Sequence, residues 1–275
     1  MPFAAALAVL GAAALHASWN ALLRAGGDRL NAVTLISLTS AAAGGVGTLI
    51  LPPPAGAAWP CIGLSSVLQT LYCIGLARAY DSGRLAQIYP VARGVSPLLV
   101  SLGALALAGE RPSPAGLAGV CLVSLGIFAV AFGSQRPEAR ALRAALLVGV
   151  LIAAYTLTDG TGGRLSGSVI GYACWLFLVQ GLVMAAVFGL LRRRPLAISM
   201  DASTAKAILG GLFSFLAYAV VVWALSLAPM GQVSALRETG ILFAMAIGVI
   251  FLKERPGAAQ LVAGAAIAAG AVLLA

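Results

Sequence analysis

Long apolar runs, each bounded by charged residues, proline or glycine, follow one another along the whole chain. A run of about 20 apolar residues in a helix crosses the hydrocarbon core of a bilayer. No alternation of apolar and polar residues competes with the helical pattern, and helices satisfy their own backbone in lipid. The pattern therefore predicts an all-α membrane protein with ten transmembrane helices. We expect these helices at residues 3–23, 31–51, 60–80, 85–108, 114–133, 140–159, 167–191, 204–228, 231–252 and 257–275.

A short motif repeats in the chain: Glu110-Arg111-Pro112 recurs as Glu254-Arg255-Pro256, 144 residues later. Aligning the two copies superimposes the fourth and fifth predicted helices on the ninth and tenth, and Arg93 on Arg237. Because five is an odd number, the two copies would cross the membrane in opposite directions. Inverted repeats of this kind are typical of secondary transporters, which hold the substrate between them near the midplane. The predicted repeats are residues 1–135 and 136–275.

Composition excludes a water-soluble fold, because 61% of the residues are hydrophobic and only 9% are charged, against about 25% charged in soluble domains. A net charge of +9 would suggest nucleic acid as a partner of a soluble protein. Here the basic residues are spread thinly over connections, so we expect no nucleic-acid partner. Thirteen of the 17 lysines and arginines lie in the connections after the first, third, fifth, seventh and ninth predicted helices. The other four connections contain only Arg111 and Arg164. The positive-inside rule then places both termini outside the cytoplasm.

No motif in the chain predicts an enzyme. H-E-x-x-H, G-x-S-x-G and paired carboxylates within the helices are all missing from the sequence. The four cysteines have no metal-ligand spacing, and a single histidine cannot form a metal site alone. We therefore expect no catalytic residues, no metal and no cofactor.

The Gly-Glu-Arg-Pro and Lys-Glu-Arg-Pro turns before the last helix of each five-helix half resemble those of the drug/metabolite transporter superfamily, EamA type. Within it, the chain is similar to bacterial exporters of aromatic and other neutral amino acids. The resemblance implies a multi-pass carrier of the cell inner membrane with a central cavity between the repeats, and hence periplasmic termini. Small four-helix relatives carry a glutamate in the first helix that binds protons and cations. Residues 3–23 contain no acid, so that route to proton coupling is absent here.

Polar side chains inside the predicted helices are the candidate substrate-binding residues. Such groups are costly in a bilayer and usually face the interior of the bundle. Helical spacing places several of them on common faces. The candidates are His16, Trp19, Asn20, Gln69, Tyr72, Tyr89, Arg93, Ser96, Tyr155, Trp175, Tyr218 and Arg237.

The fourth predicted helix contains two prolines, Pro90 and Pro97, on either side of Arg93. Each proline removes a helical hydrogen bond, so we expect a kink and free carbonyl groups. Arg93 either satisfies those carbonyls or binds substrate, and its repetition as Arg237 does not decide between the two roles.

Three further ionisable residues have alternative interpretations. Glu238 does not face its neighbour Arg237 on a regular helix, so we expect it to pair with Arg93 or another donor, or to take up a proton. Asp159, directly before Gly160, is predicted at an interfacial helix end. His16 is either a proton-coupling group or a neutral imidazole near the cavity.

The candidate set favours a small zwitterion as substrate. A guanidinium group can fork a carboxylate, and tyrosine or tryptophan faces attract an ammonium group. We therefore expect a secondary transporter, an exporter of small neutral metabolites and above all amino acids, working by alternating access and surrounded by lipid. The alternatives are a proton-coupled exporter of drugs or other metabolites, and a channel. The sequence does not decide the energy source or the oligomeric state, although a monomer would suffice.

Overall fold

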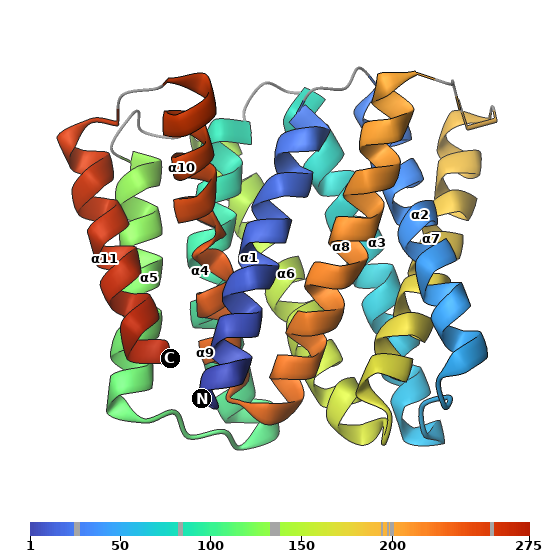
Figure 1. Ribbon diagram of the computed structural model, residues 1–275, viewed down its shortest axis with the longest axis horizontal. Helices are drawn as coiled ribbons and strands as arrows, with labels where there is room; N and C mark the ends of the chain where they lie inside the picture. Colours follow the sequence, from blue (N-terminus) through green and yellow to red (C-terminus); the bar gives the residue numbers. More distant parts are fainter. Residues whose placement is uncertain are drawn as a thin grey trace.

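The computed structural model describes residues 1–24, 28–81, 85–132, 138–193, 195–196, 198, 201–253 and 256–275. Within these ranges the chain forms helices and no strand, and Figure 1 shows them standing side by side as a bundle. The helices are α1 (Phe3–Arg24), α2 (Arg29–Ile50), a 3-10 turn η1 (Gly56–Ala58), α3 (Trp59–Asp81), α4 (Leu85–Ala108), α5 (Pro114–Phe132), α6 (Ala139–Leu165), α7 (Val169–Arg192), α8 (Ala202–Leu227), α9 (Met230–Glu238), α10 (Gly240–Leu252) and α11 (Ala258–Leu274).

Local sequence signals set several helix boundaries. The Asp28 side chain accepts a hydrogen bond from the backbone N–H of Asn31 and so caps α2. The Asp201 side chain accepts one from the backbone N–H of Thr204 and caps α8 in the same way. Gly109, which follows α4, has a φ of 64°, a left-handed conformation that glycine adopts without steric strain. Pro114 occupies the first position of α5, where its missing N–H breaks no helical bond.

The observed helices match the predicted ones to within a few residues, with two differences. α6 continues to Leu165, six residues beyond its predicted end at residue 159. The predicted ninth helix is divided at Thr239, where α9 ends and α10 begins. The Thr239 backbone N–H and hydroxyl both donate to the Leu236 carbonyl, at 3.2 and 2.7 Å, so the turn tightens there.

Eight segments of the described chain are long and apolar enough to cross a membrane, α9 and α10 together counting as one. Two further apolar stretches, Phe3–Ser18 and Ala258–Leu274, are shorter. Large apolar side chains on the outside support a lipid environment, as Leu49 is 87% and Leu107 83% exposed. The protein is therefore a multi-pass membrane protein, whereas ten crossings remain a prediction.

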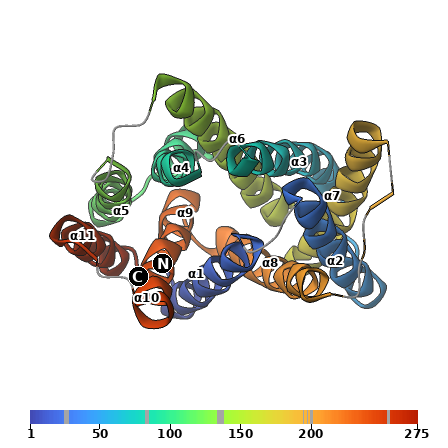
Figure 2. The same cartoon turned by 90° about the horizontal axis from the view of Figure 1, so that it is seen from above.

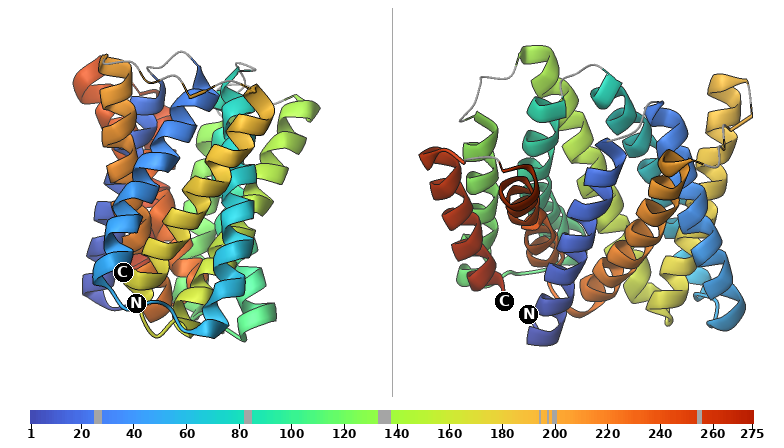
Figure 3. Two further views of the ribbon diagram at one scale, coloured as in Figure 1. Left: turned by 90° about the vertical axis from the view of Figure 1, so that its right-hand side faces the viewer. Right: turned by 45° about the horizontal axis from the view of Figure 1, so that its top comes forward.

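Viewed from above, the helices form two layers (Figure 2). The first layer contains α5, α4, α6, α3 and α7 in that order, and the second contains α11, α9 with α10, α1, α8 and α2. Contacts between α5 and α11 join the layers at one end and contacts between α2 and α7 at the other, which the views of Figure 3 also show. In the middle, α4 contacts α9 and α6 contacts α8. Both termini lie at the same end of the bundle, the lower end in Figure 1.

Small residues allow α5 and α11 to approach closely. A Cβ on Gly126 would lie 2.9 Å from the Ala263 carbonyl oxygen, and one on Gly270 would lie 2.9 Å from that of Gly119. α5 and α11 thus meet through faces of small residues. Gly264 instead faces α10, because it lies about 100° around the helix from Ala263.

Candidate functional site

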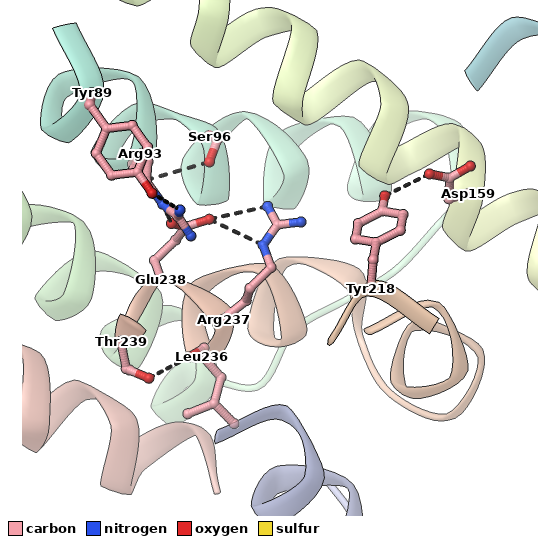
Figure 4. Close-up of polar contacts among 9 residues, drawn as sticks. All are labelled: Tyr89, Arg93, Ser96, Asp159, Tyr218, Leu236, Arg237, Glu238 and Thr239. Atoms are coloured by element: carbon pink, nitrogen blue, oxygen red, sulfur yellow. Dashed lines mark hydrogen bonds and ion pairs between the residues drawn. The ribbon is translucent and has the colours of Figure 1, made fainter. Parts of the chain in front are cut away.

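Three charged side chains meet between the layers, where α4 contacts α9 (Figure 4). The Nε of Arg93 donates to Oε2 of Glu238, while Nε and Nη2 of Arg237 donate to Oε1 at 3.2 and 3.1 Å. All three residues are buried, at 8, 3 and 1% exposure for Arg93, Arg237 and Glu238. Two guanidinium groups thus share one carboxylate, which leaves one positive charge in the interior of the bundle.

The division of the ninth predicted helix explains this arrangement. We expected Glu238 not to face Arg237, and this expectation was wrong because α9 ends at Glu238 rather than continuing as a regular helix. The break also sets the beginning of α10 next to Glu238.

Arg93 has two side-chain partners, Glu238 and Tyr89. Its Nη1 donates to the Tyr89 hydroxyl oxygen, and its Cζ lies 5.1 Å from the centre of the Tyr89 ring, a geometry suited to a cation–π contact. Pro97 cannot donate to the Arg93 carbonyl, and the Ser96 hydroxyl does so instead at 3.4 Å. The carbonyl freed by Pro97 is thus bonded by Ser96 and not by the guanidinium group.

Three of the predicted tyrosines form a row of rings across α3, α6 and α8. Tyr155 lies between the other two, with its ring centre 5.7 Å from that of Tyr72 and 5.8 Å from that of Tyr218. Both contacts are edge-to-face, the arrangement that aromatic quadrupoles favour. Phe177 of α7 extends the row, 6.0 Å from Tyr218.

Asp159 is completely buried and accepts hydrogen bonds from the side chains of Ser65, Gln69, Tyr172 and Tyr218. The Tyr218 hydroxyl donates to Oδ2 at 2.6 Å, the Tyr172 hydroxyl to Oδ1 at 2.9 Å and the Gln69 amide to Oδ2 at 3.2 Å. The predicted interfacial position of Asp159 was wrong, because α6 continues past it. Its spacing of four residues from Tyr155 is the sequence signal that could have placed it on the inward face.

The other predicted residues occupy different surroundings. His16 of α1 is partly buried and within electrostatic range of Arg93 and Arg237. Trp175 does not join the tyrosine row but packs edge-on against Trp59, with ring centres 5.0 Å apart. The side chains of Trp19 and Asn20 lie outside the described part of the structure.

Glu110, in the first copy of the repeated turn, joins three connections at the end of the bundle that holds the termini. Its Oε1 lies 2.6 Å from Nη2 of Arg164, and its Oε2 accepts the backbone N–H of Met230 at 2.8 Å, which caps α9. Arg164 also donates to the carbonyls of Leu225 and Ala228 at the end of α8. The corresponding residues of the second copy, 254 and 255, lie outside the described residues.

Comparison with known proteins now identifies the chain. Residues 140–275 match the model of the EamA-like transporter family. This chain carries an EamA-like transporter domain. The protein is accordingly a membrane transporter of the drug/metabolite superfamily. The EamA-like domain spans α6 to α11 and so contains Asp159, Tyr218, Arg237 and Glu238, while Arg93 and Tyr89 come from the preceding half.

A solved structure named "Crystal structure of protein" is similar in fold to this chain over nearly all of the given sequence. Its TM-score is 0.76, with 18% sequence identity, and the match covers 98% of this chain and 96% of that one. No curated protein matches the chain. At this level of identity the similarity concerns the fold alone.

Proposed function

We propose that the protein is a secondary transporter that exports small neutral metabolites, with amino acids as the preferred class. The observation that carries this proposal is the sharing of Glu238 by Arg93 and Arg237. A substrate carboxylate would neutralise the remaining positive charge. A guanidinium group can bind both carboxylate oxygens through two parallel hydrogen bonds.

The tyrosine row supplies complementary groups for the rest of such a substrate. The faces of Tyr72, Tyr155 and Tyr218 can attract an ammonium group and can stack on an apolar or aromatic side chain. The charged trio and the row come from α3, α4, α6, α8 and α9, that is, from both halves of the sequence. A substrate held between them would contact both layers of the bundle.

The helix contacts support two inverted repeats, residues 1–135 and 136–275. If α1 to α5 are paired with α6, α7, α8, α9–α10 and α11, the α2–α7 and α5–α11 contacts map onto themselves. The α1–α8 contact maps onto α3–α6, and α4–α6 maps onto the contacts of α1 with α9 and α10. A twofold axis in the membrane plane produces this pattern, and it favours alternating access by movement of the layers over a fixed channel.

Loop charge supports the proposed orientation. The segments between α1 and α2, α3 and α4, α5 and α6, α7 and α8, and α10 and α11, with the adjoining helix ends, carry thirteen of the 17 lysines and arginines of the sequence, and these helix ends lie opposite the termini (Figure 1). By the positive-inside rule this end faces the cytoplasm, so the termini are periplasmic and the membrane is the cell inner membrane. In this orientation, export would take the cargo in at the basic end and release it near the termini.

Uptake of radiolabelled neutral amino acids into proteoliposomes tests the proposal, with Arg93→Lys as the decisive variant. Lysine keeps the positive charge but loses the planar fork, so we expect the KM to rise at least about tenfold, which corresponds to about 1.4 kcal/mol of binding energy. Arg140→Lys is the matched control, because Arg140 is exposed at the start of α6. A folded Arg93→Lys protein with the KM of the wild type would rule out a carboxylate site at Arg93.

A further inference from the structure

Asp159 is a buried carboxylate to which the proposed substrate site gives no role. It has no exposed surface, and the side chains that donate to it, Ser65, Gln69, Tyr172 and Tyr218, are all neutral. Among the ion pairs of the described residues, none includes Asp159. A charged carboxylate in the interior is costly unless it is hydrogen-bonded, paired or neutralised.

The charged side chains buried between the layers are already paired. Arg93 and Arg237, on α4 and α9, share Glu238, and at the end of α6 itself Arg164 pairs with Glu110. In the described part of the chain, the titratable groups within electrostatic range of Asp159 are one thiol and three phenols. They are Cys61 on α3, Tyr155 on α6, Tyr172 on α7 and Tyr218 on α8.

Close packing around Asp159 limits what it can bind. A Cβ on the adjacent Gly160 would lie 2.6 Å from Sδ of Met230, and one on Gly162 would lie 2.5 Å from the Tyr172 ring. The surface of α6 next to Asp159 is therefore closely packed against Met230 and Tyr172. A proton binds directly to a carboxylate oxygen and needs no cavity, unlike a metal or ammonium ion, so it is the cation that fits this site.

The two tyrosine bonds of Asp159 differ in what they connect. Tyr172 lies on α7, in the same layer as α6, whereas Tyr218 lies on α8, in the opposite layer (Figure 2). Figure 4 shows the Tyr218 hydroxyl pointing from α8 to Asp159. The Tyr218–Asp159 bond therefore holds the layers together, as the Arg93–Glu238 pair does between α4 and α9.

We infer that Asp159 is the binding site of a coupling proton and that Tyr218 transmits its occupancy to the second layer. The inference rests on the proposed transport function and names its energy source. A proton from the aqueous phase binds Oδ2, and the carboxyl group then becomes a donor at the position where Tyr218 donates in the charged form. The charge-assisted bond from Tyr218 is replaced by a weaker neutral bond, in which the carboxyl group donates to the Tyr218 hydroxyl oxygen, while Oδ1 still accepts from Tyr172. Protonation thus weakens this link between the layers.

Infrared difference spectroscopy of the full-length protein in lipid tests proton binding without any transport substrate. We expect a C=O stretching band of a protonated carboxyl group that grows as the pH falls and is missing in Asp159→Asn. Tyr172→Phe and Tyr218→Phe each remove one hydrogen bond from this carboxyl group, so each should shift the band without abolishing it. The absence of the band in the wild type, or its persistence in Asp159→Asn, would overturn the inference.

Transport with and without a pH gradient tests coupling, using L-leucine as the probe and a matched pair of tyrosine variants. We expect the gradient to accelerate leucine transport by the wild type and by Tyr172→Phe, but not by Asp159→Asn or Tyr218→Phe. Equal loss of the gradient effect in both tyrosine variants would refute the role of the cross-layer bond. The role of Asp159 would be refuted if His16→Gln lost the effect of the pH gradient while Asp159→Asn kept it. It would also be refuted if sodium accelerated transport in place of protons.

The two tests separate this inference from the proposed function. If the wild type moves no amino acid but the carboxyl band titrates and depends on Asp159, the amino-acid substrate is wrong and the proton site stands. If leucine is transported at the same rate with and without a pH gradient and no band appears, the proton site is wrong and the transport function stands.

Discussion

Replacing Glu238 by glutamine removes the carboxylate that Arg93 and Arg237 share, and leaves two buried guanidinium groups without a counter-charge. Breaking a buried ion pair by removing one partner costs about 3–5 kcal/mol. Arg93→Met should cost less, about 1.5–3 kcal/mol, because the remaining Arg237–Glu238 pair is neutral and only the charged hydrogen bonds of Arg93 are lost.

The double variant Arg93→Met/Glu238→Gln provides the sharpest test of this electrostatic reasoning. It leaves Arg237 as the single buried charge of the trio, so we expect it to be more stable than Glu238→Gln alone. The coupling energy should fall in the range of about 0.5–3 kcal/mol that contacting residues show. The measurement is reversible unfolding in mixed micelles, followed by circular dichroism. A double variant less stable than Glu238→Gln would refute the charge balance we assign to the trio.

Two other predictions concern packing and the turn motif. Gly126→Val should destabilise the α5–α11 contact by about 1–3 kcal/mol through overpacking, whereas Gly11→Ala, with nothing within 4 Å of the added Cβ, should be neutral or slightly stabilising in the same unfolding assay. Glu110→Gln should weaken the ion pair with Arg164 and the cap on Met230. Hydrogen exchange at the α8–α9 connection should then accelerate, and unchanged exchange there would contradict the structural role we give to this turn.

Helix positions were predictable because the signals that set them are local. Apolar runs, the capping residues Asp28 and Asp201, and the prolines and glycines at helix ends act within a few residues. The division at Thr239 was not predictable in this way. The pairing of Glu238 with Arg93, 145 residues away in sequence, was among the expected alternatives and is confirmed, whereas its sharing with the adjacent Arg237 was not expected.

The surroundings of Asp159 illustrate the opposite kind of error. A glycine-rich stretch after Asp159 favours a helix end, yet the helix continues because these glycines serve close packing. Gly160 lies against Met230 and Gly162 against the Tyr172 ring. Long-range packing contacts thus outweighed a local turn signal. As a result Asp159, which we expected at an interfacial helix end, lies in the interior.

Counterflow measures the central claim, which is that two layers alternately expose one carboxylate-binding site. Proteoliposomes are loaded with unlabelled neutral amino acid and diluted into a trace of the same labelled compound. We expect labelled substrate to accumulate transiently above its equilibrium level, with saturation, and we expect Arg93→Lys to suppress the overshoot while Arg140→Lys retains it. Flux that never overshoots and rises linearly with concentration would contradict a carrier of this kind and would favour a channel.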